Sequence, residues 1–254
     1  MTEGVLYGVG VGPGDPDLIT VKAMKVLQRV PVVAWPAPLE GESLARRIAA
    51  PHLPDGAIEI PIRMPMVEAR FPAEQVYDAA AAQISEHLVA GRDVAVLCEG
   101  DPFFYGSFMY LFARMTERHR VEVIPGVSSL TASAAMTGAP LASRNDVLTV
   151  LPAPLPEEDL SRRLKAADAV AFIKVGRHFD KVLRLLDAEG MADSALYIQH
   201  ATMEKQMILP LRDAPAAAVP YFSMILAHRR GDAWRKPDDD SAAPPFSAAG
   251  GGRS

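Results

Sequence analysis

The stretch VGVGPGDPDLIT, residues 9–20, ends a short apolar run and leads into a segment of helical character. Gly10, Gly12 and Gly14 surround Pro13 and Asp15, a composition typical of a tight turn between a strand and a helix. A turn of this kind lets a ligand approach the backbone closely. The alternative is a plain turn in which Asp15 or Asp17 caps the next helix.

Runs rich in β-branched residues alternate with helical patterns on either side of this turn, which indicates βαβ units and a mostly parallel sheet. The expected strands cover residues 5–11, 30–35, 57–60, 93–98 and 121–124. Val76, Ala80, Ile84 and Leu88 recur at a spacing of four before Gly91, which predicts an amphipathic helix over residues 74–90.

The segment IPGVSSLTASAAMTGAP, residues 124–140, opens with a Pro-Gly turn and suggests a domain boundary near Pro125, followed by a tightly packed helix. Further strands are expected at 146–151, 169–174, 194–199, 206–209 and 221–227, the last three close enough to be antiparallel. We therefore expect an α/β domain over residues 1–125 and a mixed α/β domain over 126–228.

Two segments are expected to lie outside regular structure. The prolines of LPAPLPEE, residues 151–158, predict a stiff polar connector. Residues 229–254 combine charge runs, prolines and glycines without apolar periodicity, which predicts a disordered tail.

Composition narrows the function classes. The 254 residues include 49% apolar side chains, enough for a real core, and the formal charge of -5 makes nucleic acid a poor first partner. The single cysteine, Cys98, suits a reducing compartment, so we expect a cytoplasmic protein. No apolar stretch is long enough for a membrane span, no signal peptide is indicated, and the histidines and the cysteine form no ligand-spaced metal cluster.

The glycine turn matches neither common nucleotide motif. A dinucleotide fingerprint read from Gly8 requires glycine where Pro13 stands, and one read from Gly10 requires it where Asp15 stands. No Gly-Lys-Ser/Thr follows, which excludes a P-loop.

A second motif, CEGDPFFYGS, residues 98–107, closes the fourth expected strand. It places Asp101 and three aromatic residues at the carboxyl edge of the sheet, where open α/β sheets bind ligands. From composition alone, Phe103 and Phe104 are expected in the core rather than at a ligand.

Three motifs together resemble the tetrapyrrole methylases that use S-adenosylmethionine: GVGPGD at 10–15, GDP at 100–102 and PGVSS at 125–129, each after a strand and in this order. The resemblance covers about residues 4–228. Within the family, VVAWPAP (32–38), SRNDVLTVLPA (143–153) and FIKVGRHFDKV (172–182) resemble the enzymes that methylate C20 of precorrin-2 to give precorrin-3A in cobalamin biosynthesis.

The resemblance implies two α/β domains with the cofactor, S-adenosylmethionine, folded in a cleft between them and held largely by main-chain groups. It also implies a tetrapyrrole substrate and a homodimer. By motif match, the cofactor-binding residues are Pro13, Glu99, Gly100, Asp101, Phe104, Ser128, Ser129, Val175 and Ala201.

The residues that would serve the substrate are less defined. Eight carboxylates on the ring call for local cations, and we single out Arg144 and Arg177 among Arg63, Arg70, Arg144, Lys174 and Arg177. Relatives that methylate uroporphyrinogen have a proposed aspartate base where Pro36 stands here, so no base carries over. Tyr105, His178 and His200 are weak candidates.

Several alternatives stay open at this stage. The same transfer could use cobalt-factor II, and another member of the fold could methylate C11 or C17 of a corrin ring or a protein histidine in diphthine formation. A non-catalytic nucleotide-binding module is the alternative from a different class.

Overall fold

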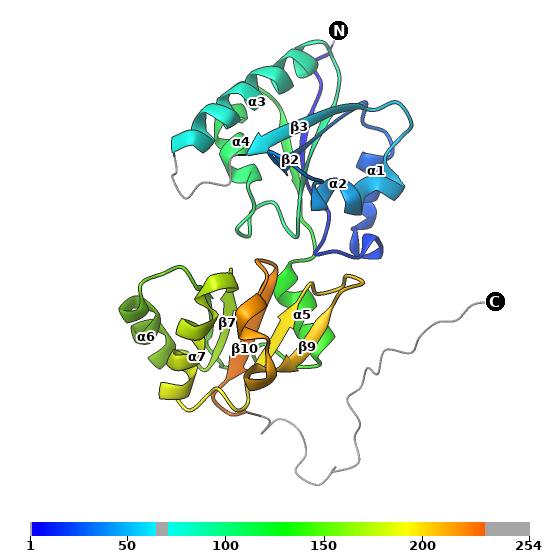
Figure 1. Cartoon of the computed structure of the whole chain (residues 1–254). Coiled ribbons are helices and arrows are strands. Elements are labelled where there is room, and N and C mark those ends of the chain that lie inside the picture. Colours follow the sequence, from blue (N-terminus) through cyan, green and yellow to red (C-terminus); the bar gives the residue numbers. More distant parts are fainter. Residues whose placement is uncertain (1, 65–70, 232–254) are drawn as a thin grey trace, which may run out of the picture. The chain divides into compact units, whose positions relative to one another are not determined.

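The computed structural model describes residues 2–64 and 71–231 and divides into two compact units between Ser129 and Leu130. Each unit has its own five-stranded sheet covered by helices (Figure 1). The sequence suggested a boundary near Pro125, in the loop before the helix that opens the second unit.

The amino-terminal unit is built on a parallel sheet with strand order β3-β2-β4-β1-β5. Its strands are β1 (Leu6–Gly10), β2 (Val32–Pro38), β3 (Ile58–Met64), β4 (Val94–Cys98) and β5 (Val121–Ile124). Its helices are α1 (Val21–Leu27), α2 (Leu44–Ala49), α3 (Phe71–Val89) and α4 (Phe108–Met115).

Both faces of this sheet are buried, as the apolar strands of a parallel sheet require. Side chains alternate along each strand, so Val9 and Leu97 pack toward α1 and α2. Leu6 and Val96 pack on the other face toward α3 and α4. All five parallel strands end at one edge, and the loops that leave this edge carry the glycine motifs.

The carboxyl-terminal unit has a mixed sheet with strand order β6-β7-β10-β8-β9. Its strands are β6 (Leu148–Pro152), β7 (Ala169–Ile173), β8 (Leu196–Gln199), β9 (Met207–Pro210) and β10 (Ser223–His228). Its helices are α5 (Ser129–Thr137), which begins at the boundary, α6 (Glu157–Lys165) and α7 (Phe179–Ala188). Strands β6 and β7 are parallel, whereas β10 is antiparallel to both β7 and β8.

The ten expected strands are all present, and the expected antiparallel pairing of the last three is confirmed. Strand β2 runs three residues beyond its expected end, to Pro38. Its pairing with β4 stops at Ala34 while its pairing with β3 continues, and Pro36 and Pro38 have no N–H to donate to a neighbouring strand. Helix α3 begins at Phe71, about one turn earlier than expected.

Two expectations about irregular segments need correction. The segment after β6 is not a polar connector, because Ala153 is fully buried and Leu155 packs against the core of the unit. The expected tail does not begin at Arg229, whose guanidinium donates to the carbonyl oxygens of Ala167 and Leu164 at 2.8 and 2.9 Å. The rest of that segment, residues 232–254, lies outside the described residues.

Candidate functional site

The three glycine motifs follow β1, β4 and β5, which are neighbours in the sheet, and they meet at its carboxyl edge. The amide of Gly100 donates to the carbonyl oxygen of Gly12 at 2.8 Å, and the amide of Gly12 donates back at 3.3 Å. These bonds extend the pairing of β1 with β4 past the regular strands. Two residues 88 positions apart in sequence, Gly12 and Gly100, are thereby held at one corner.

Glycine is required at two of these positions by packing between backbones. A Cβ on Gly126 would lie 2.0 Å from the carbonyl oxygen of Gly100, and a Cβ on Gly10 would lie 2.6 Å from the amide nitrogen of Gly126. Gly100 itself has a φ of +65°, and a Cβ there would make only ordinary contacts at 3.8 Å with the backbone of residues 127–129. The contacts that require glycine at positions 10 and 126 are therefore contacts between backbones of the three loops.

Asp101 ties the second loop to the third. Its Oδ2 accepts a hydrogen bond from the amide of Gly126 at 3.0 Å, and its Oδ1 accepts from the amide of Phe103 at 2.9 Å. Both oxygens of the carboxylate therefore hold loops in place. Asp101 thus holds the loop after β4 in shape and joins it to the loop after β5.

The first loop is shaped by its own acidic residue. Oδ1 of Asp15 accepts from the amide of Asp17 at 2.9 Å and caps a short 3-10 helix, η1 (Pro16–Leu18). Asp15 therefore caps a helix, as the plain-turn alternative expects, and this role is compatible with a ligand at the backbone of the turn. Pro13 is buried, and Gly12 before it has a φ of +81°.

Two titratable groups stand at the end of β4. Burial raises the pKa of the Cys98 thiol to about 12, and the nearby Glu99 contributes in the same direction. Burial also raises the pKa of the Glu99 carboxyl above its usual range, although backbone hydrogen bonds from Glu99 itself and from Ala45 at the start of α2 oppose this shift. Cys98 is therefore a core side chain, and Glu99 connects β4 to α2.

The aromatic residues of the second motif are exposed, so the expectation that Phe103 and Phe104 belong to the core is wrong. Phe103, Phe104 and Tyr105 are 47%, 37% and 48% exposed. Phe103 keeps one edge-on contact with Phe112 of α4, with ring centroids 5.1 Å apart, and the Phe104 and Tyr105 rings lie at the same separation. The turn that carries these rings is tight, and glycine is required at 106 because a side chain there would clash with the carbonyl oxygens of Asp101 and Pro102.

In the carboxyl-terminal unit, the loops after β7 and β8 leave the same edge of the sheet, since these two strands run in one direction on either side of β10. They carry the expected site residues Val175 and Ala201. Val175 is fully buried in the core beneath the sheet, and Ala201 packs partly against the other core. Neither the side chain nor the backbone of Val175 has exposed surface.

Both loops contain strained backbone. Lys174, His200 and Thr202 have φ values of +57°, +50° and +68°, and Tyr105 of the amino-terminal unit has +55°. Side-chain-bearing residues in this region are uncommon and cluster at functional sites. His178, in the short helix η3 (Gly176–His178), and the exposed Arg177 belong to the same edge as Lys174.

Arg144 does not share that edge with Arg177. It lies in the turn 143–146, where Asp146 accepts from the amide of Ser143 at 2.7 Å and meets His228 at the end of β10. That turn adjoins the start of β7, whereas Arg177 follows the end of β7. The two ends of this strand lie about 13 Å apart, at about 3.3 Å per residue. Ser128 and Ser129 follow Gly126 at the third loop, Arg63 is the penultimate residue of β3, and Arg70 lies outside the described residues.

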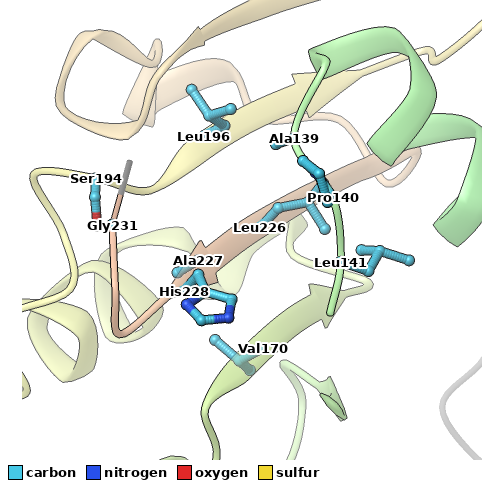
Figure 2. A pocket seen from close by; sticks show the side chains of 10 residues that line it. All are labelled: Ala139, Pro140, Leu141, Val170, Ser194, Leu196, Leu226, Ala227, His228 and Gly231. Atoms are coloured by element: carbon cyan, nitrogen blue, oxygen red, sulfur yellow. The ribbon is translucent and has the colours of Figure 1, made fainter. Parts of the chain in front are cut away.

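A small pocket, of about 30 Å³, lies at the same edge as Arg144 (Figure 2). Its lining is mostly apolar, with Pro140, Leu196 and Leu226 facing His228. A volume of this size holds about one or two waters. This pocket is a packing gap, and it offers no room for a substrate.

Further searches of the described residues concern metals and membranes. In residues 2–64 and 71–231 no group of three His, Cys, Asp or Glu side chains is placed to hold a metal ion. Within the same residues, no helix has both the length and the apolar character needed to cross a membrane.

Comparison with known proteins was informative. The family model for tetrapyrrole (corrin/porphyrin) methylases matches residues 5–215. The chain is 42% identical over 232 residues to the cobalamin biosynthesis protein CobIJ of Mycobacterium tuberculosis, which covers 88% of this chain but only 46% of that protein. This chain therefore spans about half the length of that relative.

Two other similarities extend over nearly whole chains. The precorrin-2 C(20)-methyltransferase of a Sinorhizobium species is 39% identical over 231 residues, covering 88% of this chain and 94% of that enzyme. The solved structure of the cobalamin biosynthetic enzyme CbiF, a cobalt precorrin-4 methyltransferase, superposes with a TM-score of 0.70 at 26% identity, covering 88% of this chain and 94% of that one.

Proposed function

Because the chain belongs to the tetrapyrrole methylase family, we propose that it transfers a methyl group from S-adenosylmethionine to C20 of precorrin-2, giving precorrin-3A. The observation that carries this proposal is the meeting of the three family motifs at one sheet edge, in a chain similar to a C20-methyltransferase along almost its whole length.

The residues at the glycine corner fit S-adenosylmethionine. They offer backbone polar groups and exposed rings but few charged side chains, which suits a zwitterionic nucleoside with a sulfonium. A cation is attracted to the face of an aromatic ring, and Phe104 and Tyr105 present such faces beside the loop of Gly100. We assign cofactor contacts to Pro13, Glu99, Gly100, Asp101, Phe104, Ser128, Ser129, Val175 and Ala201.

The roles within this set differ. Asp101 acts by fixing the loops around Gly100 and Gly126, and Val175 supports the loop after β7 from within the core. Gly10 and Gly126 allow the loops to touch and need not contact the ligand themselves.

When bound, S-adenosylmethionine supplies an already activated methyl group, so the protein has mainly to orient the acceptor. C20 must lie in line with the S–CH3 bond at about 3 Å, and a proton must then leave the methylated carbon. Rigid, strained loops suit this task because they hold their geometry without reorganisation. Tyr105 and His178 remain candidates for accepting the proton, and we assign no base.

Methyl transfer is tested directly by incubating the purified chain with S-adenosylmethionine and either precorrin-2 or its cobalt form. We expect a gain of one methyl group, followed by mass and absorption spectrum. A gain only on the cobalt form would move the proposal to the metallated substrate. If neither ring gains a methyl group while calorimetry shows that the cofactor binds, the assignment to the family stands and the proposed reaction is rejected.

We further propose a homodimer in the cytoplasm, on the strength of the family and of a single, buried cysteine that has no disulfide to form within the chain. Light scattering coupled to size exclusion tests the assembly. A monomer at micromolar concentration would contradict it.

A further inference from the structure

A larger pocket, of about 600 Å³, lies on the amino-terminal unit between α2 and the carboxyl halves of β2 and β3. Its size is in the range of ligand sites. Three arginines line it, Arg46 and Arg47 from α2 and Arg63 from β3, together with Glu42 and Glu59. The two arginines of α2 belong to none of the sequence motifs. The sequence does offer one signal for them: Ser43 is a residue type that often caps a helix, and Arg46 and Arg47 follow it by three and four residues.

Arg46 forms part of the pocket wall, and its positive charge is already paired with a carboxylate of the protein. Its guanidinium stacks over the buried Trp35 ring at 5.5 Å, and its Nε and Nη2 donate to Oε1 of Glu59 at 3.0 and 2.6 Å. The ion pair neutralises both partners and fixes a flat floor.

Arg63 and Arg47 keep their positive charge. Arg63 donates from Nη1 to the carbonyl oxygen of Pro38 at 2.9 Å, which holds it beside the end of β2, and within the residues that the structure describes its other N–H groups have no partner. Arg47 is exposed and its guanidinium has no partner among residues 2–64 and 71–231. The carboxylate of Glu42 likewise has none in that part of the chain. Two cations against one anion leave the pocket positive.

The arginines are held on an ordered frame. The Ser43 hydroxyl donates to the carbonyl oxygen of Pro36 at 2.8 Å and caps α2 through the amide of Arg46. The carboxyl of Glu99 reaches the amide of Ala45 in the same turn. The loop that follows β4 is thus joined to the helix that carries Arg46 and Arg47.

The pocket and the glycine corner share one edge of one sheet. Strands are about 4.8 Å apart, so the pocket over β3 and β2 lies two to three strands, or roughly 10 to 15 Å, from the Gly10 loop after β1. It lies three to four strands, or roughly 14 to 19 Å, from the Gly126 loop after β5. A tetrapyrrole whose reacting carbon is near the glycine corner has acidic side arms that extend over such a distance.

We propose that this pocket binds carboxylate side arms of the tetrapyrrole, with Arg63 and Arg47 as the donors; the assignment rests on the proposed function. Guanidinium groups match carboxylates in a two-pronged geometry, and the substrate has eight carboxylates for a chain of net charge -5 to meet. Arg46 and Trp35 supply the floor against which the aliphatic part of an arm lies.

The test uses three pocket variants: Arg47→Gln, Arg63→Gln and the double variant that combines them. The control is Arg118→Gln. Arg118 is an exposed arginine of the same unit, just before β5 and hence near the opposite edge of the sheet, so its replacement changes the charge equally. We expect the KM for the tetrapyrrole to rise about tenfold in each single pocket variant and further in the double variant. Calorimetric affinity for S-adenosylmethionine and the melting temperature should stay at the wild-type values.

Glu42→Gln gives a test of opposite sign. Removing the anion from the pocket should lower the KM two- to threefold, roughly what a weak charge contact is worth. Fluorescence titration with uroporphyrin III, a stable octacarboxylate, measures binding without turnover and should follow the same order of variants.

The outcomes separate the two proposals. Methyl transfer by the wild type with unchanged KM in the double variant would overturn the pocket and keep the reaction. No transfer by the wild type would remove the reaction, and uroporphyrin affinity would then decide the pocket: equal affinity in the double variant and the wild type would overturn it. A change in the oligomeric state of the pocket variants would also overturn it, in favour of an interface between copies.

Discussion

The amide N–H of Gly126 donates a hydrogen bond of 3.0 Å to Oδ2 of Asp101, across 25 residues of sequence. This bond connects the loop after β5 to the loop after β4, while the other oxygen of Asp101 accepts from Phe103 within its own loop. The aspartate of the Gly-Asp-Pro motif is therefore explained by its position between two backbones. Its effect on a ligand is indirect.

Asp101→Asn tests this role. An asparagine offers one acceptor oxygen in place of two, so one amide loses its partner, and we expect the free energy of unfolding to fall by about 1–3 kcal/mol. Affinity for S-adenosylmethionine should fall as well, because the loops lose their fixed spacing. Urea titration and calorimetry measure the two effects. Asp17→Asn, an exposed aspartate of the same unit, is the control and should change neither.

Gly126→Ala should be more damaging than Gly100→Ala. A methyl group at 126 would sit 2.0 Å from a carbonyl oxygen, so the loops must separate, and overpacking of this kind costs about 3 kcal/mol or more. At 100 the methyl group fits, and only the positive φ is unfavourable, by about 1–2 kcal/mol.

Fluorescence of the buried Trp35 reports unfolding of this unit when Trp234 is replaced by phenylalanine. Equal losses in Gly126→Ala and Gly100→Ala would show that backbone contact is not what requires glycine at 126.

Glu99→Gln should change stability in a pH-dependent manner. Burial raises the folded-state pKa of Glu99, so the native carboxyl binds its proton more tightly than the unfolded one. The contribution of Glu99 to the free energy of unfolding is therefore fully present below the pKa that it has in the unfolded chain. This contribution is lost as pH rises through the pKa that it has in the folded protein. Glutamine stays neutral and avoids this loss.

We therefore expect Glu99→Gln to match the wild type near pH 4 and to exceed it in thermal stability at pH 8. Melting curves across this range, with the exposed Glu40→Gln as control, measure the difference. A variant less stable than the wild type at pH 8 would mean that the hydrogen bonds from the Glu99 and Ala45 amides outweigh burial.

Cys98 should resist thiol reagents in the native protein. Its side chain is 1% exposed and its pKa is raised to about 12, so thiolate is scarce at neutral pH. We expect no reaction with Ellman's reagent at pH 8 over minutes and full reaction in urea. Rapid native labelling would show that the end of β4 opens readily.

The sequence predicted the strands well because apolar runs and glycine stops are local signals. Strand neighbours, by contrast, depend on contacts distant in the chain, and nothing near Gly12 indicates that it pairs with Gly100. Phe103 and Phe104 were expected in the core because aromatic residues are mostly buried. They lie instead in the tight, exposed turn after β4, and composition does not reveal which aromatic residues a turn places at the surface.

The two arginines singled out from the sequence illustrate the same limit, and they lead to the last prediction. Arg144 and Arg177 both lie beside family motifs, yet the direction of β7 places them at opposite edges of one sheet. Only Arg177 lies at the edge where the loops of Lys174 and His200 leave the sheet, and positive φ does not separate the two arginines because Arg144 itself has a φ of +52°. We expect Arg177→Gln to raise the KM for the tetrapyrrole about tenfold and Arg144→Gln to leave it unchanged.

Steady-state kinetics of methyl transfer, with cofactor saturating, compare the two. Both side chains are exposed, so neither variant should lose stability, and each serves as the charge-matched control of the other. The opposite result would be a KM that rises equally in Arg144→Gln and Arg177→Gln. The substrate would then not be confined to the edge where β6, β7 and β8 end, and the assignment of that edge to substrate binding would fail.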